Sequence, residues 1–189
     1  MNTLPLVGSN GLHKEESDRD TLLRIEVHDR QALERLYLSY YNPLVRLLSR
    51  VVTLPSVVDE IIHETFMTIW NRAKEFGFES RVAVWIFGIA YRTALQSIRP
   101  QTIRGDYAGI RGPDDDCESD EPSVDDLEHR LGRLPLEECV ALALAYQMGF
   151  SVEEIANITG AAPGTVKMRI SHARTSLRPF GQPTDVLPP

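Results

Sequence analysis

The chain has 189 residues, of which 42% are hydrophobic and 25% charged, and its net charge is −7. This composition is sufficient for one folded domain or two small ones. Because the chain has neither a run of 18 apolar residues nor a basic start followed by an apolar stretch, we expect no transmembrane helix and no signal peptide.

The negative charge is concentrated in one segment. Residues 105–128 hold ten acidic residues and one basic residue, whereas the blocks 20–104 and 129–189 each carry a small excess of basic side chains. The acidity of the whole chain therefore does not exclude nucleic acid as a partner. The two cysteines, Cys117 and Cys139, form no motif and indicate no disulfide framework.

Residues 1–19 are polar without a helical period, and we expect them to be disordered. From Asp20 to about Arg99 the sequence indicates helix. Apolar residues recur with helical spacing from Leu33 to Val51, with Asp29 as a candidate N-cap and Pro43 as an interruption. A second helix is predicted from near Ser56, with Ser56 and Asp59 as an acidic cap, and a third over about 82–98.

The segment 74–81, "KEFGFESR", lies between the second and third predicted helices and holds two aromatic residues beside basic ones. Residues 104–126 are rich in Gly, Pro and Asp, which predicts a flexible acidic linker. After it we expect a short helix over about 124–131, a helix over about 135–148, and a disordered tail beyond Pro179. No strand is indicated, so the predicted fold is all-α, with two small helical domains.

Residues 151–178 have the pattern of a helix-turn-helix that binds DNA. Ser151 and Glu154 form a capping box, Gly160 suits the left-handed end of a helix, and Pro163 suits the first turn of the next one. The second helix has one apolar stripe and several basic residues beside it: Val166, Ile170, Ala173 and Leu177 make the stripe. The alternative is an ordinary amphipathic hairpin with a solvated basic face.

Taken together, these segments resemble the extracytoplasmic-function (group IV) sigma factors of bacterial RNA polymerase. "ALERLYLSYYNPLVRLLSRV", "VVDEIIHETFMTIW" and "VWIFGIAYRTAL" are similar to region 2 of that family, and "LGRLPLEECVALALAYQMGFSVEEIANITGAAPGTVKMRISHARTSL" is similar to region 4. The resemblance covers about residues 20–179 and implies a region 2 domain over 20–103 and a region 4 domain over 127–180. The acidic linker occupies 104–126 between them, and the expected disordered segments are the extension over 1–19 and the tail over 181–189.

Four positions depart from the usual family pattern. His63 stands where Gln is common, Gln96 where Asp is common, and Cys139 where Arg is common. Ala162 occupies the position of a Ser that usually caps the recognition helix, although Thr165 is a candidate to compensate.

The resemblance implies that the second helix docks on a basic coiled coil of the largest polymerase subunit. Acidic side chains that meet Arg or Lys there would steer and orient the complex, with a small apolar contact. The six candidates are Asp59, Glu60, His63, Glu64, Met67 and Asn71. The alternative for these residues is a solvated acidic helix face.

The resemblance also implies that the aromatic loop and the third helix bind the minus-ten element of a promoter. Opening DNA requires aromatic faces that stack on unpaired bases and basic groups that hold phosphates. The candidates for the single strand are Phe76, Phe78, Ser80 and Arg81. Those for the duplex are Arg92, Gln96 and Arg99. Trp85 is interpreted as a core residue, and Tyr91 stays undecided.

The second helix of the helix-turn-helix would enter the major groove at the minus-thirty-five element. Lys167, Met168, Ser171 and His172 are best placed for base edges, with Thr175 on the same side. Arg169, Arg174 and Arg178 suit phosphates or acidic neighbours. The acidic linker is interpreted either as a passive spacer or as a polyanion that occupies the RNA path of the polymerase.

Other classes of function fit the sequence less well. No metal-ligand spacing joins the five His residues to one another or to a Cys, and no phosphate loop or nucleophile elbow is present, so we expect no enzyme, cofactor or metal. A stand-alone helix-turn-helix regulator with a helical sensing or dimerisation domain is the main alternative, and a module that sequesters a partner is another.

The implied partners are core RNA polymerase, promoter DNA and an anti-sigma factor. The implied location is the bacterial cytoplasm, with an anti-sigma factor as the means of retention at the membrane.

Overall fold

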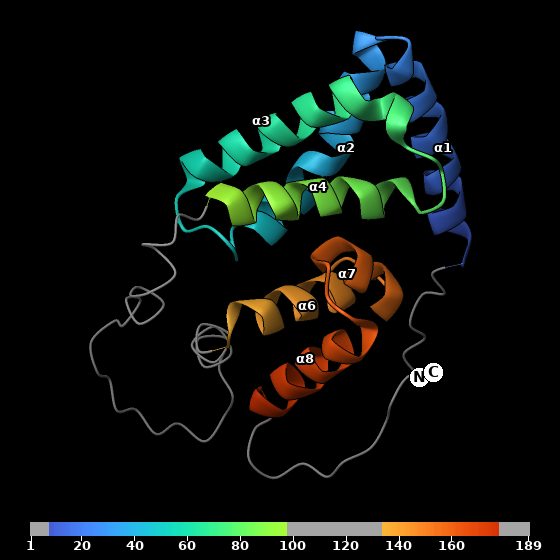
Figure 1. Ribbon diagram of the computed structural model, residues 1–189. Helices are drawn as coiled ribbons and strands as arrows, with labels where there is room; N and C mark the ends of the chain where they lie inside the picture. The colour runs from blue at the N-terminus through green and yellow to red at the C-terminus, as the bar shows by residue number, and fades with distance from the viewer. Residues whose placement is uncertain (1–7, 98–133, 178–189) are drawn as a thin grey trace.

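The structure of the chain is a computed structural model that describes residues 8–97 and 134–177 (Figure 1). The first described range forms α1 (Gly8–Glu26), α2 (Arg30–Leu48), α3 (Pro55–Arg72), the short 3₁₀ helix η1 (Ala73–Glu75) and α4 (Val82–Ser97). The second forms α6 (Leu136–Tyr146), α7 (Val152–Thr159) and α8 (Pro163–Ser176). The described residues contain no strand, which confirms the prediction of an all-α fold.

Helix α4 lies at the centre of the molecule. In Figure 1 it runs between the α1–α3 layer on one side and the α6–α8 unit on the other. Its sequence is apolar on almost every side, and the residues from Val82 to Ala94 are buried except for Trp85, which is half-buried, and Arg92, which is exposed. A helix that is hydrophobic all round requires cover on all sides, and the two blocks together provide it.

The structure shows how α2 and α3 begin, and it agrees with one of the two predicted caps. Asp29 caps α2 as expected, because its carboxylate accepts hydrogen bonds from the backbone amides of Gln31 and Ala32. The predicted acidic cap of Ser56 and Asp59 on α3 is wrong. Helix α3 begins one residue earlier, at Pro55, whose missing N–H costs nothing in the first turn, and no side chain caps it.

The expectation of disorder over 1–19 is wrong for residues 8–19, which belong to α1. This helix is anchored at its C-terminal half, where Leu22 and Ile25 are fully buried in the core. One turn earlier, the buried hydroxyl of Tyr40 on α2 donates a hydrogen bond to the carboxylate of Asp18. Lys14 lies 3.6 Å from the same carboxylate, measured from Nζ to Oδ2. Long-range packing therefore orders a segment whose local sequence is polar.

Asp18 should make the free energy of unfolding depend on pH. Burial raises the pKa of its carboxyl above 3.8, against the opposing effects of Tyr40 and Lys14. The folded state then holds the proton more tightly than the unfolded chain, so stability falls as pH rises from 3.8 towards the raised pKa. Urea unfolding of the wild type and of Asp18→Asn across this window should show the wild type losing stability relative to the variant. A constant difference would contradict this assignment.

The helix-turn-helix has the predicted local structure. Ser151 and Glu154 form both hydrogen bonds of the capping box on α7. Gly160 ends α7 with a φ of 71°, which glycine adopts without the steric cost of a Cβ atom. Pro163 is the first residue of α8, and Val166 and Ala173 on its inner side are buried. The turn residues and the apolar stripe thus fix the angle between α7 and α8.

The N-terminus of α8 lacks a side-chain cap, because the N-cap residue is Ala162. Its φ of −65° and ψ of 146° already match an N-cap conformation. Replacing Ala162 by Ser should therefore add a hydrogen bond to a helix amide and raise the free energy of unfolding by about 0.5–2 kcal/mol. Chemical unfolding measures the change. An unaltered stability would indicate that Thr165 or water already satisfies these amides.

The two blocks contact each other through α4 and α7. The rings of Phe87 and Phe150 meet edge to face, with centroids 5.2 Å apart. An ion pair joins Arg81 Nη1 to Glu154 Oε1 at 3.1 Å. At the other end of the contact, Arg50 Nη1 lies 3.9 Å from the Sγ atom of Cys139. The two predicted domains are thus packed together in this structure.

Several predictions concern residues outside the described ranges. These are the linker over 104–126, the short helix over 124–131, the tail, and Cys117, Arg99 and Arg178. Within 8–97 and 134–177, no helix is both long enough and apolar enough to cross a membrane.

Candidate nucleic-acid and polymerase interfaces

Helix α3 presents one exposed face that is polar except for Met67. All six residues predicted to bind polymerase lie on it and are exposed: Asp59, Glu60, His63, Glu64, Met67 and Asn71. In the described ranges, no Lys or Arg side chain forms an ion pair with the three carboxylates. The face therefore carries negative charge that is not neutralised within the described part of the chain, which favours a basic partner.

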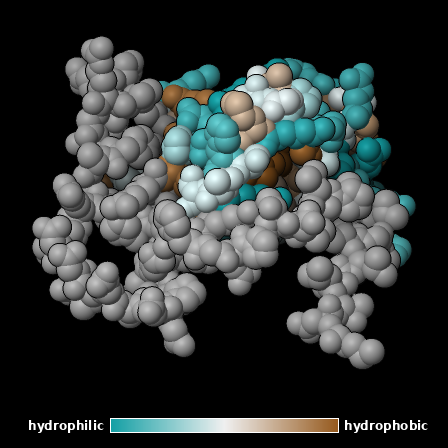
Figure 2. Space-filling model, turned by 90° about the horizontal axis from the view of Figure 1, so that it is seen from below, coloured by the Kyte–Doolittle hydropathy of each residue, from teal (hydrophilic) through white to brown (hydrophobic). Residues whose placement is uncertain are grey.

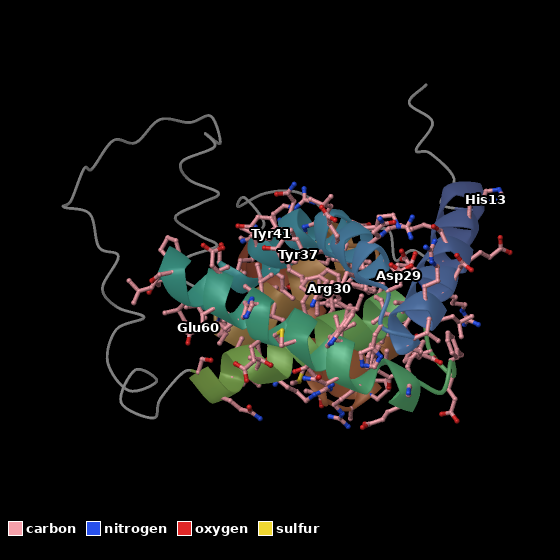
Figure 3. The ribbon with its side chains drawn as sticks, turned by 90° about the horizontal axis from the view of Figure 1, so that it is seen from above. His13, Asp29, Arg30, Tyr37, Tyr41 and Glu60 are labelled. Carbon is pink, nitrogen blue, oxygen red and sulfur yellow. The ribbon has the colours of Figure 1, made fainter. Side chains whose placement is uncertain are left out.

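The carboxylate of Asp59 is held in place by α2. The hydroxyl of Tyr41 donates a hydrogen bond to Asp59 Oδ1, with an O···O distance of 2.9 Å. This bond and the negative charge of Asp59 raise the pKa of the Tyr41 hydroxyl. Figure 3 shows Tyr41, Tyr37 and Arg30 in a row along α2, beside α3. This row was not among the predicted site residues, although its spacings of seven and four residues place it on one side of the helix.

An apolar pocket lies between α2 and α3, next to the acidic face. Its volume is about 410 Å³, and its surface is mainly apolar, although Arg30 and Glu34 of α2 also line it. Leu33 and Tyr37 line it from α2, and His63, Met67 and Trp70 line it from α3. Met67 is 45% exposed although it is hydrophobic. Acidic groups beside an apolar recess provide the two kinds of contact that orient a protein partner and add affinity.

The 76–81 loop combines buried and accessible aromatic rings. Phe76 is only 6% exposed and packs between Phe78 and Trp85, with ring centroids 4.9 and 5.0 Å away. Phe78 is half-buried and has a positive φ of 56°. Of the two predicted stacking residues, Phe78 is therefore the accessible one, and Phe76 supports it from beneath. Trp85 is half-buried and packs against the core.

The polar residues of the loop have partners in both blocks. Arg81 is exposed, yet it forms the ion pair with Glu154 of α7 and lies over the Phe150 ring at 5.8 Å. Ser80 is half-buried, and its hydroxyl donates to the carbonyl oxygen of Arg81 at 3.5 Å. The C-terminal block thus occupies Arg81 in this structure.

The residues predicted for duplex DNA lie further along α4. Arg92 and Gln96 are both exposed and are one helical turn apart, so they share a side of the helix. Gly88 leaves room for the first of them, because a Cβ atom at Gly88 would lie 3.2 Å from Arg92 Nη1. The arrangement gives two hydrogen-bonding side chains near the C-terminal end of α4, where Leu95 and Ser97 are exposed as well.

Helix α8 exposes a polar row that fits direct reading of base edges. Lys167, Met168, Ser171, His172 and Thr175 are exposed, whereas Arg169 and Arg174 are half-buried. Figure 2 views the molecule from the side on which α8 lies. Hydrophilic residues dominate the coloured part of this face, and the most hydrophobic ones show only between them. A basic and polar helix face of this kind suits the major groove.

One residue of this row is oriented by its own block. His172 Nδ1 lies 3.6 Å from Glu138 Oε1 of α6. The hydroxyl of Thr175 donates to the carbonyl oxygen of Ser171 at 3.0 Å. Lys167 and Met168, nearer the N-terminus of α8, have no such neighbour in the hydrogen bonds and ion pairs of the described residues. They are the better placed pair for contacts with bases.

Comparisons with known proteins identify the family of the two blocks. A family model of Sigma-70 region 2 matches residues 36–103, and a model of Sigma-70 region 4 matches residues 125–177. The ECF RNA polymerase sigma factor SigM of Mycobacterium tuberculosis is 26% identical over 178 residues, covering 92% of this chain and 88% of the relative. The ECF RNA polymerase sigma-E factor of Haemophilus influenzae is 27% identical over 183 residues, covering 88% of this chain and 96% of the relative. The chain belongs to the extracytoplasmic-function sigma factors.

Solved structures resemble the fold of this sigma factor. CnrH, in complex with the cytosolic domain of CnrY, superposes with a TM-score of 0.62 at 18% identity and covers 85% of this chain and 94% of CnrH. The sigma factor RpoE of Bartonella quintana, in complex with the anti-sigma factor NepR, has a TM-score of 0.59 at 23% identity, with coverage of 76% and 92%.

The sigma factor has features that the sequence analysis missed. These are the part of α1 before Asp20, the apolar pocket beside α3, and the contacts of Phe150 with α4 and of Glu154 with Arg81. The buried positions Asp18, Leu22 and Ile25 of α1 follow a helical period, and this spacing is the sequence pattern that indicates the helix. Among the described residues, no group of three or more His, Cys, Asp or Glu side chains is placed to hold a metal ion.

Proposed function

We propose that this sigma factor binds core RNA polymerase through α3 and directs promoter-specific initiation of transcription. The observation that carries the proposal is the exposed acidic row of α3 beside an apolar pocket, in a chain whose other block is a helix-turn-helix. Region 2 and region 4 occur in the order that such a protein needs. RNA synthesis itself belongs to the polymerase, and the sigma factor acts as a non-enzymatic initiation factor.

The docking surface consists of Asp59, Glu60, His63, Glu64, Met67 and Asn71, with the pocket beside them. Its partner is the basic coiled coil of the largest polymerase subunit. Carboxylates steer the encounter over distances of about 10 Å at moderate salt. The exposed Met67 and the pocket then accept an apolar side chain of the partner, which lowers the dissociation rate.

Promoter recognition divides between the two blocks. Helix α8 reads the minus-thirty-five element with Lys167, Met168, Ser171, His172 and Thr175, and Arg169, Arg174 and Arg178 hold phosphates. The 76–81 loop captures an unpaired base of the minus-ten element on Phe78, with Ser80 and Arg81 near the backbone and Phe76 as support. Arg92, Gln96 and Arg99 approach the neighbouring duplex. Each good base contact contributes about 1–3 kcal/mol of discrimination.

An anti-sigma factor is the further partner in this proposal. Its support is that the structural relatives CnrH and RpoE were solved with CnrY and with the anti-sigma factor NepR. Such a partner would cover the acidic face of α3 and hold the sigma factor inactive in the bacterial cytoplasm. A membrane-anchored partner would hold it at the membrane.

A stand-alone helix-turn-helix regulator is not favoured, because it has no need of a region 2 block with an acidic docking helix and an aromatic loop. The test is co-purification of the chain with bacterial core RNA polymerase, followed by transcription from a promoter library. Stoichiometric binding and a reproducible two-element motif are expected. Tight binding to duplex DNA without any binding to core polymerase would overturn the proposal and restore the regulator.

A further inference from the structure

The 76–81 loop is held by the N-terminal helix. Arg19 of α1 donates a hydrogen bond from Nη2 to the carbonyl oxygen of Phe78, with an N···O distance of 3.4 Å. The same guanidinium lies over the Phe78 ring, 5.7 Å from its centroid. One side chain thus contacts both the backbone and the ring of the residue that is accessible for stacking. Fifty-nine positions separate the two residues along the chain.

Glu15 contacts the other end of the same loop. Its Oε1 atom accepts a hydrogen bond from the backbone amide of Val82, the first residue of α4, at 3.0 Å. The first amides of a helix have no partner within the helix, and a carboxylate there also interacts favourably with the helix dipole. Glu15 therefore fixes the point at which the loop ends and α4 begins.

The two side chains of α1 form one unit with Arg81. Arg19 Nε donates to Glu15 Oε1 at 3.1 Å, so each side chain orients the other. Arg81 Nε lies 3.9 Å from Glu15 Oε2. Glu15 belongs to the same block as the loop, so this contact does not depend on the position of α7.

The backbone of the loop needs such support. Phe78 has a φ of 56°, a left-handed conformation that a bulky side chain rarely adopts unless its surroundings impose it. Within the turn, Gly77 precedes Phe78 and the side chain of Glu79 is exposed, so the local restraint on Phe78 is the contact of its ring with Phe76. The contacts of Arg19 with the Phe78 carbonyl and ring are restraints that a strained position requires.

We propose that Glu15 and Arg19 are positioning residues that hold the 76–81 loop ready to capture the unpaired base of a promoter. The inference rests on the proposed function, because it assigns a role to α1 in the same site. Neither residue needs to contact DNA. They keep Phe78 and Arg81 in place before the base pair opens, so that opening does not also require the loop to become ordered.

The experiment uses the full-length chain bound to core RNA polymerase and two forms of one promoter. One form is fully base-paired, and the other is mismatched over the minus-ten element and so already open. 2-Aminopurine in the minus-ten element reports opening by its fluorescence, and the affinity for core polymerase is measured separately. The variants are Glu15→Ala, Arg19→Ala and Glu15→Gln. Glu16→Ala is the matched control, because the Glu16 side chain on the same helix is 80% exposed.

Glu15→Ala and Arg19→Ala should each slow opening of the paired promoter at least about tenfold, as expected when a preorganised contact is misplaced. On the mismatched promoter, the rate of the 2-aminopurine fluorescence change should fall by no more than about threefold, because the energy of unpairing is already supplied. Affinity for core polymerase should not change, since the docking face is on α3. Glu15→Gln keeps an oxygen acceptor for the Val82 amide and should recover most of the opening rate.

Three outcomes would overturn the inference while leaving the proposed function intact. Opening rates equal to those of Glu16→Ala would remove any role for the two residues. Equal losses on both promoters would place them in a DNA contact. A loss of core binding in parallel with opening, for Arg19→Ala as well as Glu15→Ala, would make them general stabilisers of the fold. If wild type and Glu16→Ala both fail to bind core polymerase, the proposed function itself fails.

Discussion

Replacing both Asp59 and Glu60 by arginine is expected to weaken binding to core RNA polymerase by at least about 100-fold, or about 2.7 kcal/mol. Two attractive contacts with a basic partner become two repulsive ones, and like charges at an interface cost several kcal/mol. Neither carboxylate forms an ion pair with a Lys or Arg side chain of the described residues, so the substitution breaks none there. Binding titrations at two salt concentrations measure the effect, which should shrink at high salt.

The matched control carries the same change of charge on another helix. Glu16→Arg with Asp20→Arg alters two exposed residues of α1, one helical turn apart, and should leave the affinity for core polymerase nearly unchanged. Asp59→Arg also removes the hydrogen bond from Tyr41, so urea unfolding must show that the variant remains folded. Similar losses in the two double variants would mean that net charge, and not the face of α3, governs binding.

The helix-turn-helix was predictable because its signals are local. A capping box, a left-handed glycine and an N-terminal proline each act within four residues, and the structure places all three as the sequence indicated. The same holds for Asp29 at the start of α2. Such features depend on short backbone segments, and tertiary packing does not need to be known to find them.

Helix α1 was not predictable in the same way. Its residues from Asn10 to Asp20 are mostly polar, and local propensity alone leaves such a segment unfolded. What orders it is a set of contacts with residues far along the chain: Tyr40 with Asp18, Phe78 with Arg19, and Val82 with Glu15. Sequence patterns within a window of fifteen residues contain no record of these partners.

The exposed helix faces of the candidate site were predictable from the sequence. The burial of individual side chains in the 76–81 loop was not. Exposure of the six α3 residues follows from helical spacing. The different surroundings of Phe76 and Phe78 do not, because both belong to one short loop and have the same side chain. The burial of Phe76 depends on Trp85 of the next helix, whose ring lies 5.0 Å away. Which of two neighbouring aromatics is accessible is decided by tertiary packing.

The packed arrangement of the two blocks should not survive binding to a promoter. The names of the two elements place them about 25 base pairs apart, or about 85 Å along B-DNA at about 3.4 Å per base pair. A compact body of the size of the two described blocks has a radius of gyration of about 14 Å. Helix α8 and the 76–81 loop therefore cannot reach both elements while α7 stays packed on α4.

The contact between the blocks is suited to opening. Its polar part is a pair, Arg81 with Glu154, whose side chains are 43% and 21% exposed, and exposed pairs of this kind contribute about 1 kcal/mol or less. Its apolar part centres on the rings of Phe87 and Phe150. The 36 residues over 98–133 can span at most about 120 Å when extended, which is enough for the distance between the elements.

Distance measurements between labels can test this separation. Labels are attached at Leu38→Cys on α2 and Asn157→Cys on α7, both exposed, after Cys117 and Cys139 have been replaced by Ser. The distance between them should rise by at least about 30 Å when core polymerase and a promoter bind, because the two elements are about 85 Å apart.

A second pair of labels at Leu23→Cys and Leu38→Cys lies within the first block, so its distance should stay constant. An unchanged distance between Leu38 and Asn157 in a complex that still makes RNA would contradict the separation. It would mean that only one of the two blocks contacts the promoter. A long distance already present in the unbound chain would instead show that the pairing of Arg81 with Glu154 is too weak to hold the blocks together. In that case Arg81 would be available to DNA without any opening step, and Glu15 alone would orient it.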